Sequence, residues 1–307
     1  DVGETDNVMS VTVSDASGAD VTKNYALTYT YGTLSVTPRP VRIQTASETW
    51  VYDGEHHFNK EFTAEGESEG RGILTEHKVG VISHTEIADV GEAENQLAIG
   101  ISGAAGADVT KNYNAEYIYG TLSVTPRSVH FTTGTSGDVY DGEPFFDETL
   151  LTEAATEDSG LVAWHHTQVL SRTEITDVGS AENVLSAAIF DGGRDVTKNY
   201  APTYLYGTLS VTPRPVTFYA DGKEKVYDDK PYTGPFTLTA VSEYVPALVL
   251  DHVGSATFSV DGVDAGMYTI CISEPHVFSG EKDVTHNYSI GLQNGTLSIM
   301  PRPIAIT

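Results

Sequence analysis

The sequence predicts an all-β protein made of tandem Ig-like antiparallel β-sandwich repeats, each about 88 residues long, in an elongated array. Three observations predict this fold class. Thr, Ser, Val, Gly and Tyr are abundant, and no long apolar stretch has the 3.6-residue period of a helix. Several short motifs recur with one period. Pro-Arg-Pro linkers, with Pro-Arg-Ser in one copy, favour extended backbone and separate the periods.

The repeat is defined by four markers that agree on a spacing of 87 or 88 residues. Agreement among independent markers indicates an array of similar structural units. The markers are DVTKNY or DVTHNY, beginning at Asp20, Asp108, Asp195 and Asp283; the glycine of GTLS at Gly32, Gly120, Gly207 and Gly295; the tyrosine of VYDG or VYDD at Tyr52, Tyr140 and Tyr227; and DVG or DAG at Asp1, Asp89, Asp177 and Asp264.

The domain boundaries are predicted at the prolines, in the motifs that begin at Thr37, Thr125, Thr212 and Met300. Residues 1–38 are then the C-terminal part of a truncated repeat, 39–126 and 127–213 are β repeats, 214–301 is a divergent β repeat, and 302–307 are the first strand of a following repeat. A unit of this length is large enough for a small core. Because residues 1–38 lack half of their repeat, we expect them to be poorly packed or completed by a neighbour, unless the true boundary is phased differently.

Local patterns predict where strands and turns lie. Asn294-Gly295 separates two alternating runs, which predicts a β-hairpin at this glycine, with Tyr-Gly at the same place in the other copies. Tyr25, Leu27, Tyr29 and Tyr31 share one strand face, and we expect them to pack in the core and at its edge. Asp-Gly in VYDG predicts a strand end and turn. Entry strands are predicted at residues 41–43, 129–131, 216–218 and 304–306.

Composition excludes several classes of partner. The chain has 43 acidic and 17 basic residues and a net charge of −26, which argues against nucleic acid and against anionic membrane surfaces. No run of 18 apolar residues predicts a membrane span. The single cysteine, Cys271, has no internal disulfide partner, and we expect it to pack as a small buried apolar side chain.

The order VYDG, a strand with a histidine, DVG, DVTKNY and GTLSVTPRPV resembles the YDG/MBG-type tandem β repeats of large bacterial cell-surface, adhesin-like proteins. The resemblance covers essentially the whole chain. It implies an extracellular stalk on the bacterial cell surface, attached to the cell wall through regions outside this sequence, that carries a binding domain away from the cell. The partners it implies are neighbouring repeats and, as candidates, host mucin, glycan or a surface protein.

Recurrent polar residues are the candidate sites. His77, His165 and His252 are equivalent, but their neighbours differ, which favours structural hydrogen bonding over a metal site. The adjacent histidines His56-His57 and His165-His166 occupy different repeat positions. Because neighbouring residues on a strand point to opposite faces, the two histidines of a pair do not form a shared site. The best calcium candidates are the Asp and Asn of the DVTKNY motif, namely Asp20 and Asn24, Asp108 and Asn112, Asp195 and Asn199, and Asp283 and Asn287.

Local chemistry offers an alternative to calcium, because these side chains also form Asx turns, and we favour the turn. Lys23, Lys111 and Lys198 recur in the same motif and are candidates for isopeptide bonds, but the fourth copy has His286. The acidic stretches at residues 4–7, 92–95 and 180–183 are candidate loops for a cation or partner, and the divergent repeat lacks the stretch after Asp264.

The sequence predicts no enzyme. No nucleophile, P-loop or HExxH motif occurs, so no catalytic, cofactor-binding or metal residue is assigned and no cofactor is expected, with calcium as the one candidate. Two functions remain open. The first is a structural spacer. The second is a repeat that itself binds mucin glycans or a host surface protein through Trp50, Trp164 or the tyrosine rows, although the two tryptophans are not repeat equivalents.

Overall fold

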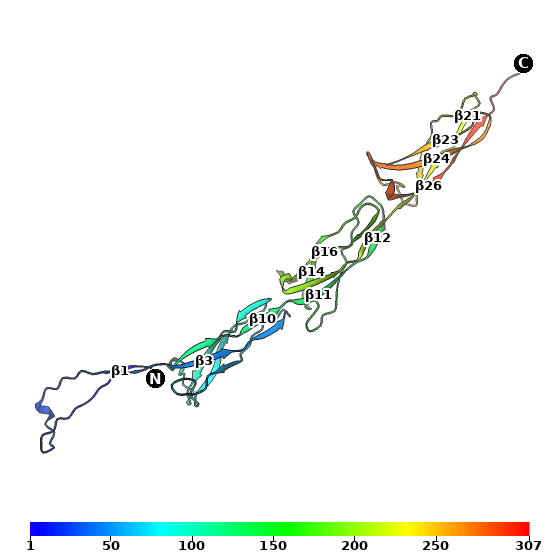
Figure 1. Ribbon diagram of the computed structural model, residues 1–307. Helices are drawn as coiled ribbons and strands as arrows, with labels where there is room; N and C mark the ends of the chain where they lie inside the picture. The colour runs from blue at the N-terminus through cyan, green and yellow to red at the C-terminus, as the bar shows by residue number, and fades with distance from the viewer. Residues whose placement is uncertain (307) are drawn as a thin grey trace. The chain divides into compact units, whose positions relative to one another are not determined.

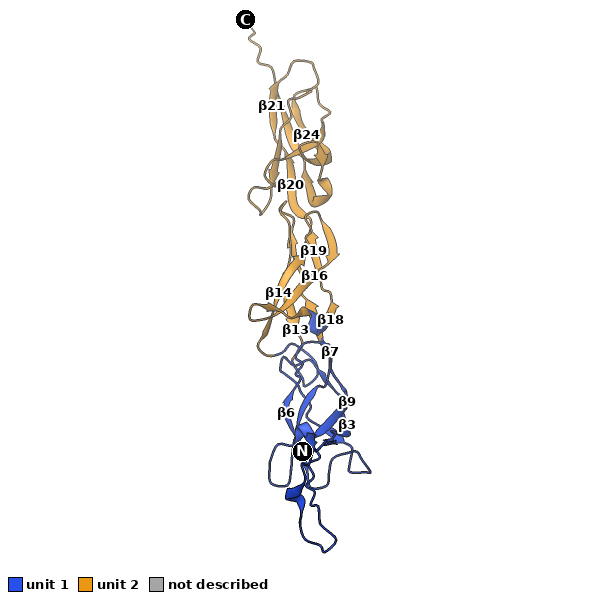
Figure 2. Cartoon of the chain, turned by 90° about the vertical axis from the view of Figure 1, so that its left-hand side faces the viewer, with its two compact units in different colours: residues 1–128, 155–162, 198–201 blue, residues 129–154, 163–197, 202–307 orange. Residues whose placement is uncertain are grey.

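The computed structural model describes residues 1–306 and is all-β, which confirms the fold class (Figure 1). Its regular elements are β-strands and short 3-10 helices. Over these residues, no helix has the length and apolar character needed to cross a membrane. The chain forms two compact units (Figure 2): unit 1 holds residues 1–128, 155–162 and 198–201, and unit 2 holds residues 129–154, 163–197 and 202–307. This division falls inside the repeat 127–213, and the repeat boundaries stay a sequence prediction.

Unit 1 contains the complete repeat 39–126, whose strands form three small sheets of order β5-β3-β9, β4-β10-β7 and β6-β8. Burial alternates along β3 and β8, as expected for strands with one face on a core. That core is centred on Ile43, Leu97 and Ile101. The elements are β3 (Arg39–Thr45), β4 (Glu48–Val51), β5 (Phe62–Ala64), β6 (Lys78–His84), β7 (Gly91–Glu94), β8 (Leu97–Ser102), η2 (Thr110–Asn112), β9 (Tyr113–Ile118) and β10 (Thr121–Thr125).

Unit 2 contains most of repeat 127–213 and the complete repeat 214–301. Phe218, Ile270 and Leu297 are fully buried in the core of the latter. The elements of the first are β11 (Arg127–Thr133), β12 (Ser136–Val139), β13 (Leu150–Thr152), β14 (His165–Arg172), β15 (Gly179–Glu182), β16 (Leu185–Asp191), β17 (Arg194–Asp195), η3 (Thr197–Asn199), β18 (Tyr200–Leu205) and β19 (Thr208–Thr212). Those of the second are β20 (Arg214–Ala220), β21 (Lys223–Val226), β22 (Leu238–Val241), β23 (His252–Ser259), β24 (Gly266–Ser279), β25 (Lys282–Asp283), η4 (Thr285–Asn287), β26 (Tyr288–Gln293) and β27 (Gly295–Met300).

The sheets are mixed rather than purely antiparallel. The first strand of a repeat pairs in parallel with its penultimate strand, as β3 does with β9 and β20 with β26. The second strand likewise pairs in parallel with the last strand, as in β4–β10, β12–β19 and β21–β27. The predicted entry strands at residues 41–43, 129–131 and 216–218 are confirmed within β3, β11 and β20.

The predicted hairpin at the GTLS glycine is wrong. β9 and β10 flank Gly120 but lie in different sheets, because β9 pairs with β3 whereas β10 pairs with β4 and β7. β26 and β27 are separated in the same way. The chain therefore passes from one sheet to the other at this glycine. Next to this glycine, the chain also crosses between the same two sheets as it passes from the first strand of the repeat to the second.

Close approach of these two crossing segments explains the recurrent glycine. A Cβ on Gly120, Gly207 or Gly295 would lie 2.3, 2.1 or 2.4 Å from the carbonyl oxygen of Ala46, Gly134 or Ala220, respectively. None of the three glycines has a positive φ. The position thus needs the absence of a side chain and not the left-handed backbone that a hairpin turn requires.

The acidic stretches are strands rather than loops. Residues 91–94 form β7, and the Asn95 that follows is fully buried and donates from Nδ2 to the carbonyl of Ala46 at 2.9 Å. Asn183 donates in the same way to Gly134 at 3.0 Å. Each asparagine therefore holds the crossing segment in place. In the divergent repeat the single long strand β24 takes this position and pairs with β27 and then with β23.

Residues 1–38 are poorly packed, which is one of the outcomes expected for this segment. β1 (Gly3–Asp6) and β2 (Thr33–Val36) form a two-stranded sheet, and η1 (Thr22–Asn24) lies between them. Every residue of β2 is exposed. Leu34 and Val36 are 52% and 57% exposed, whereas Leu122 and Val124 at the same repeat positions are 0% and 2% exposed. The apolar face of this half repeat has no opposing sheet.

The strand predicted at residues 304–306 is not formed. Ile304 and Ile306 are 80% and 92% exposed, and no strand includes them. In complete repeats this strand takes both of its neighbours from the rest of the same repeat, as β3 does from β5 and β9.

Candidate functional site: the junction between repeats

An asparagine and an aspartate link successive repeats at each of three boundaries. In unit 1, Asn112 Nδ2 donates to Asp1 Oδ1 at 2.9 Å, and its Oδ1 accepts the Val2 amide at 2.9 Å. Asn199 makes the same two bonds to Asp89 and the Val90 amide, at 2.9 and 3.0 Å. In unit 2, Asn287 bonds Asp177 and the Val178 amide at 2.7 and 2.8 Å. The DVG and DVTKNY motifs therefore contact each other across the boundary.

The DVTKNY sequence positions this asparagine through local chemistry. Asp108 Oδ1 accepts both the amide and the hydroxyl of Thr110, at 2.9 and 2.6 Å, which is an Asx turn. The 3-10 helix η2 follows and ends at Asn112. Thr110 Oγ1 also accepts the amide of Ile101, which ties the turn to β8. The motif aspartate is therefore used by its own turn, as the turn interpretation predicts.

The same Asx turn recurs in the other copies, at Asp20, Asp195 and Asp283. Hydrogen bonds from Thr285 and then from His276 lower the pKa of Asp283 to about 2. Over residues 1–306, no group of three or more His, Cys, Asp or Glu side chains is placed to hold a metal ion.

A lysine reinforces each aspartate of the junction. Lys111 Nζ lies 3.3 Å from Asp1 Oδ2, and Lys198 Nζ lies 3.1 Å from Asp89 Oδ2. Where the fourth copy has histidine in place of this lysine, Lys282 of β25 takes over, with its Nζ 3.5 Å from Asp177 Oδ2. These lysines are about two-thirds exposed, so the pairs add little stability by themselves. The lysines stay candidates for isopeptide bonds, which intact mass would test.

The arginine that follows the linker proline, in Pro-Arg-Ser at 126–128 and Pro-Arg-Pro at 213–215, is the second part of the junction. Arg127 is 4% exposed and donates to five backbone carbonyls. Four belong to residues 156–160 of its own repeat, and the fifth is the carbonyl of Tyr52 in the preceding repeat, at 3.3 Å. Arg214 reaches the carbonyl of Tyr140 in the same way, at 3.3 Å. The sequence did not predict a role for these arginines, although each follows a recurrent proline and begins a strand.

Tyrosines form the third part. Tyr52 of the VYDG motif is 3% exposed and meets Tyr200 of the DVTKNY motif edge to face, with ring centroids 5.5 Å apart. Tyr140 and Tyr288 repeat this contact in unit 2 at 5.6 Å. VYDG also ends its strand in a turn, as predicted. Gly54 and Gly142 adopt φ of 84° and 86°, and Asp229 takes this role at 56°.

The recurrent histidines support the junction tyrosines. His77 Nδ1 lies 2.7 Å from the hydroxyl of Tyr113, and His252 Nδ1 lies 2.8 Å from the hydroxyl of Tyr288. Burial lowers the pKa of His165 and of His252, which favours the neutral form of both side chains. The prediction of structural hydrogen bonding is confirmed for His77 and His252.

The remaining candidate residues are scattered. His57 lies 2.9 Å from Asp53 and stacks on Trp50, whereas His56 lies near Glu86. His166 stacks on Phe190, and Trp164 is 52% exposed. The prediction that Cys271 is buried is wrong, because Ile270 and Ile272 on either side of it take the inward positions of β24.

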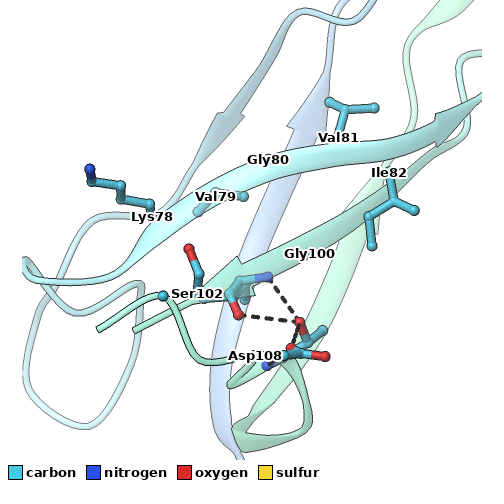
Figure 3. Close-up of a pocket in the computed structure, with 11 residues that line it drawn as sticks. Lys78, Val79, Gly80, Val81, Ile82, Gly100, Ser102 and Asp108 are labelled. Atoms are coloured by element: carbon cyan, nitrogen blue, oxygen red, sulfur yellow. Dashed lines mark hydrogen bonds between the residues drawn. The ribbon is translucent and has the colours of Figure 1, made fainter. Parts of the chain in front are cut away.

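A shallow groove of about 410 Å³ lies on the solvent face of β6 and β8 (Figure 3). Gly80 and Gly100 face each other across the two strands and leave a surface without side chains, flanked by Ile82. Among its eleven lining residues, Lys78 and Asp108 are the charged ones, and the Asp108 carboxylate accepts bonds from Thr110. The groove therefore offers no arrangement of acid, base and nucleophile.

The fold and the junction define a protein of tandem all-β repeats. No protein-family model matches the chain, and no curated protein matches it. Among solved structures, Drosophila N-cadherin EC1-3 aligns with a TM-score of 0.28 and 10% identity, over 84% of this chain and 98% of that one. Drosophila N-cadherin EC1-4 aligns with a TM-score of 0.22 and 8% identity, over 87% and 73%. Likeness at this level says nothing about function.

Acidification is expected to weaken the junction held by Asp177. The hydrogen bond from Asn287, and then the charge of Lys282, hold the pKa of Asp177 below its usual value of 3.8. A carboxylate with a lowered pKa stabilises the folded state above its unfolded pKa, and this stability is lost as pH falls through the folded pKa. The melting temperature should therefore decrease as the pH is lowered below about 4. Asp177→Asn should show a smaller decrease in melting temperature on acidification than wild type. Asp261→Asn, which changes an exposed carboxylate, should show the same decrease as wild type. Identical pH profiles for all three would contradict the role of Asp177.

Proposed function

We propose that this chain is a non-enzymatic structural spacer, a set of stalk repeats of an extracellular bacterial surface adhesin that projects a binding domain from the cell. The observation that carries the proposal is the recurrent junction. Asparagine–aspartate bonds occur at all three boundaries, and the arginine–carbonyl and tyrosine–tyrosine contacts occur at two of them. Contacts specified this consistently restrict rotation between adjacent repeats, and a spacer needs that property more than any catalytic group.

Small-angle X-ray scattering tests the spacer. A compact chain of 307 residues would have a radius of gyration of about 19 Å. Two successive extended strands such as β3 and β4 give a repeat a length of about 40 Å at roughly 3.3 Å per residue. Repeats joined end to end are therefore expected to give a radius of gyration about twice the compact value. A value near 19 Å would exclude a spacer.

A junction variant separates stiffness from length. Asn199→Ala removes both bonds to Asp89 and Val90, and we expect it to broaden the distribution of distances between spin labels placed on the two adjoining repeats. Asn114→Ala, at an exposed asparagine in β9, is the matched control and should leave the distribution unchanged. Equal distributions for the two variants would show that the asparagine does not set the stiffness.

A second candidate function rests on paired surface tyrosines. Tyr117 and Tyr119 stack with centroids 5.5 Å apart, and Tyr204 and Tyr206 stack at 5.7 Å. Tyr119 and Tyr206 are 39% and 38% exposed, and stacked aromatic rings suit a sugar face. A glycan array would then give signal that falls on Tyr206→Ala. The repeat 214–301, with Leu292 and Asn294 at these positions, should bind nothing. Arrays without signal would eliminate this candidate.

A further inference from the structure

We propose that the junction between the repeats 127–213 and 214–301 loosens on mild acidification, with His252 as the residue that takes up the proton. The proposal rests on the spacer function proposed above, because it adds regulation to the same junction. Three residues of the second repeat carry it, namely Val249, His252 and Tyr288, and each of them contacts the VYDG turn of the repeat before it.

Two consecutive hydrogen bonds determine the protonation state of His252. The amide of Val249 donates to the hydroxyl oxygen of Tyr288 at 3.0 Å, and this hydroxyl lies 2.8 Å from Nδ1 of His252. An amide only donates, so it occupies a lone pair of the phenol oxygen, and the single phenolic proton is directed at Nδ1. Nδ1 is then the acceptor, which requires the neutral imidazole with its proton on Nε2.

The same pair of hydrogen bonds occurs in repeat 39–126. The amide of Leu74 donates to the hydroxyl of Tyr113 at 3.3 Å, and this hydroxyl lies 2.7 Å from Nδ1 of His77. His77 and His252 hold equivalent places in their repeats, although the residues beside them in the sequence differ. The bond from amide to tyrosine to histidine is therefore a property of the repeat and not of the divergent copy alone.

Protonation of His252 breaks this arrangement. A proton on Nδ1 would face a hydroxyl that already accepts an amide, and the phenolic proton would lose its acceptor. Tyr288 is 6% exposed, so an unpaired hydroxyl there costs free energy. Burial lowers the pKa of His252 from its usual value of 6.5, and the charge of Asp251 opposes this shift. The stability contributed by the neutral form is therefore present above pH 6.5 and is lost as the pH falls through the lower pKa of the folded state.

Each member of the hydrogen-bonded set is packed against the preceding repeat. The ring of Tyr140 lies 5.6 Å from the ring of Tyr288 and 6.2 Å from the ring of His252, measured between centroids. Val249 packs on Gly142, where a Cβ would lie 2.7 Å from Val249 Cγ1. Tyr140 is 4% exposed, so its ring is enclosed by these contacts. A displacement of Tyr288 or His252 therefore changes the contacts that hold the two repeats together.

Other charged groups line the same depression of about 390 Å³, namely Glu143, Asp177, Asp251 and Lys282. The carboxylates attract an imidazolium, and the ammonium repels it. His286 is the second histidine of this junction, and its charge acts on Asp177. Protonation of His286 would add an attraction to Asp177 and tighten the junction, whereas protonation of His252 loosens it. The direction of the pH response therefore distinguishes the two histidines.

Spin-label distances test the proposal. Labels on cysteines placed at the exposed residues Glu153 and Glu224, with Cys271→Ser as background, report the distance between the two repeats. We expect a narrow distribution of distances at about pH 7.5 and a broader one at about pH 5. A narrow distribution at both pH values would overturn the pH response and leave the spacer function standing. A broad distribution at both would overturn the pH response and the spacer function together.

Two substitutions identify the histidine. His252→Asn keeps an acceptor near the position of Nδ1 but does not titrate, so we expect its distribution to be the same at both pH values. His286→Asn is the matched control, and its distribution should broaden on acidification at least as much as that of the wild type. A response that persists in His252→Asn, or that disappears in His286→Asn, would overturn the assignment to His252.

Nitrogen NMR of the wild-type imidazole needs no substituted residue and so does not depend on how a variant folds. We expect neutral His252 to carry its proton on Nε2 and to titrate with a midpoint below 6.5. A neutral imidazole with its proton on Nδ1, or a midpoint above 6.5, would overturn the proposal.

Discussion

Gly207→Ala is expected to destabilise its repeat by about 3 kcal/mol, although it adds one methyl group. The new Cβ would lie 2.1 Å from the Gly134 oxygen and 2.5 Å from its carbonyl carbon. Both atoms are backbone, so no side-chain rotation relieves the clash, and the two crossing segments must separate. Their separation would also break the hydrogen bond that the Gly207 amide donates to the Thr133 hydroxyl at 2.8 Å.

The half repeat supplies the control for this substitution. Gly32 holds the same position in the motif, but a Cβ there would meet nothing within 4 Å. Gly32→Ala is expected to change stability by no more than about 0.5 kcal/mol. Because a chain of several repeats need not unfold in two states, amide hydrogen exchange in β19 and β2 is the suitable measurement. Equal effects at the two glycines would contradict close approach as the reason for the motif.

Arg127→Met is expected to cost about 3–5 kcal/mol, since it removes the donor of five hydrogen bonds to backbone carbonyls at a largely buried site. Arg127→Lys should retain only part of the stability that Arg127→Met loses, because an ammonium has three donors and lacks the planar fork of the guanidinium. We expect protection from hydrogen exchange to fall at residues 156–160. It should also fall near Tyr52 in the preceding repeat, because Arg127 bonds its carbonyl.

A second arginine separates burial from charge. Arg42→Met removes the same positive charge from the neighbouring repeat, where the side chain is 52% exposed and pairs with Glu116 at 3.3 Å. An exposed pair of this kind is worth about 1 kcal/mol at most. If Arg127→Met cost no more stability than Arg42→Met, the hydrogen bonds of Arg127 would not stabilise the junction.

The sequence was sufficient wherever one residue's role depends on its near neighbours. Alternation in β3, β11 and β20, the Asx turn of Asp108 and the turn after Tyr52 are local, so they could be predicted from a few residues. The equivalence of Asn112, Asn199 and Asn287 was also visible. Their partners were not, because each bond joins residues about 110 positions apart.

The sequence by itself determined the β class, the period and the turns, because these follow from side-chain alternation and backbone preference within short windows. Only the tertiary structure decided what the recurrent residues do. Gly120 reads as a hairpin turn in sequence but is a crossing point, since the Ala46 carbonyl that excludes a Cβ belongs to the segment between β3 and β4, which is distant in sequence. Leu34 and Leu122 stand in the same motif, yet one is 52% exposed and the other 0%, because burial depends on the opposing sheet and not on the motif.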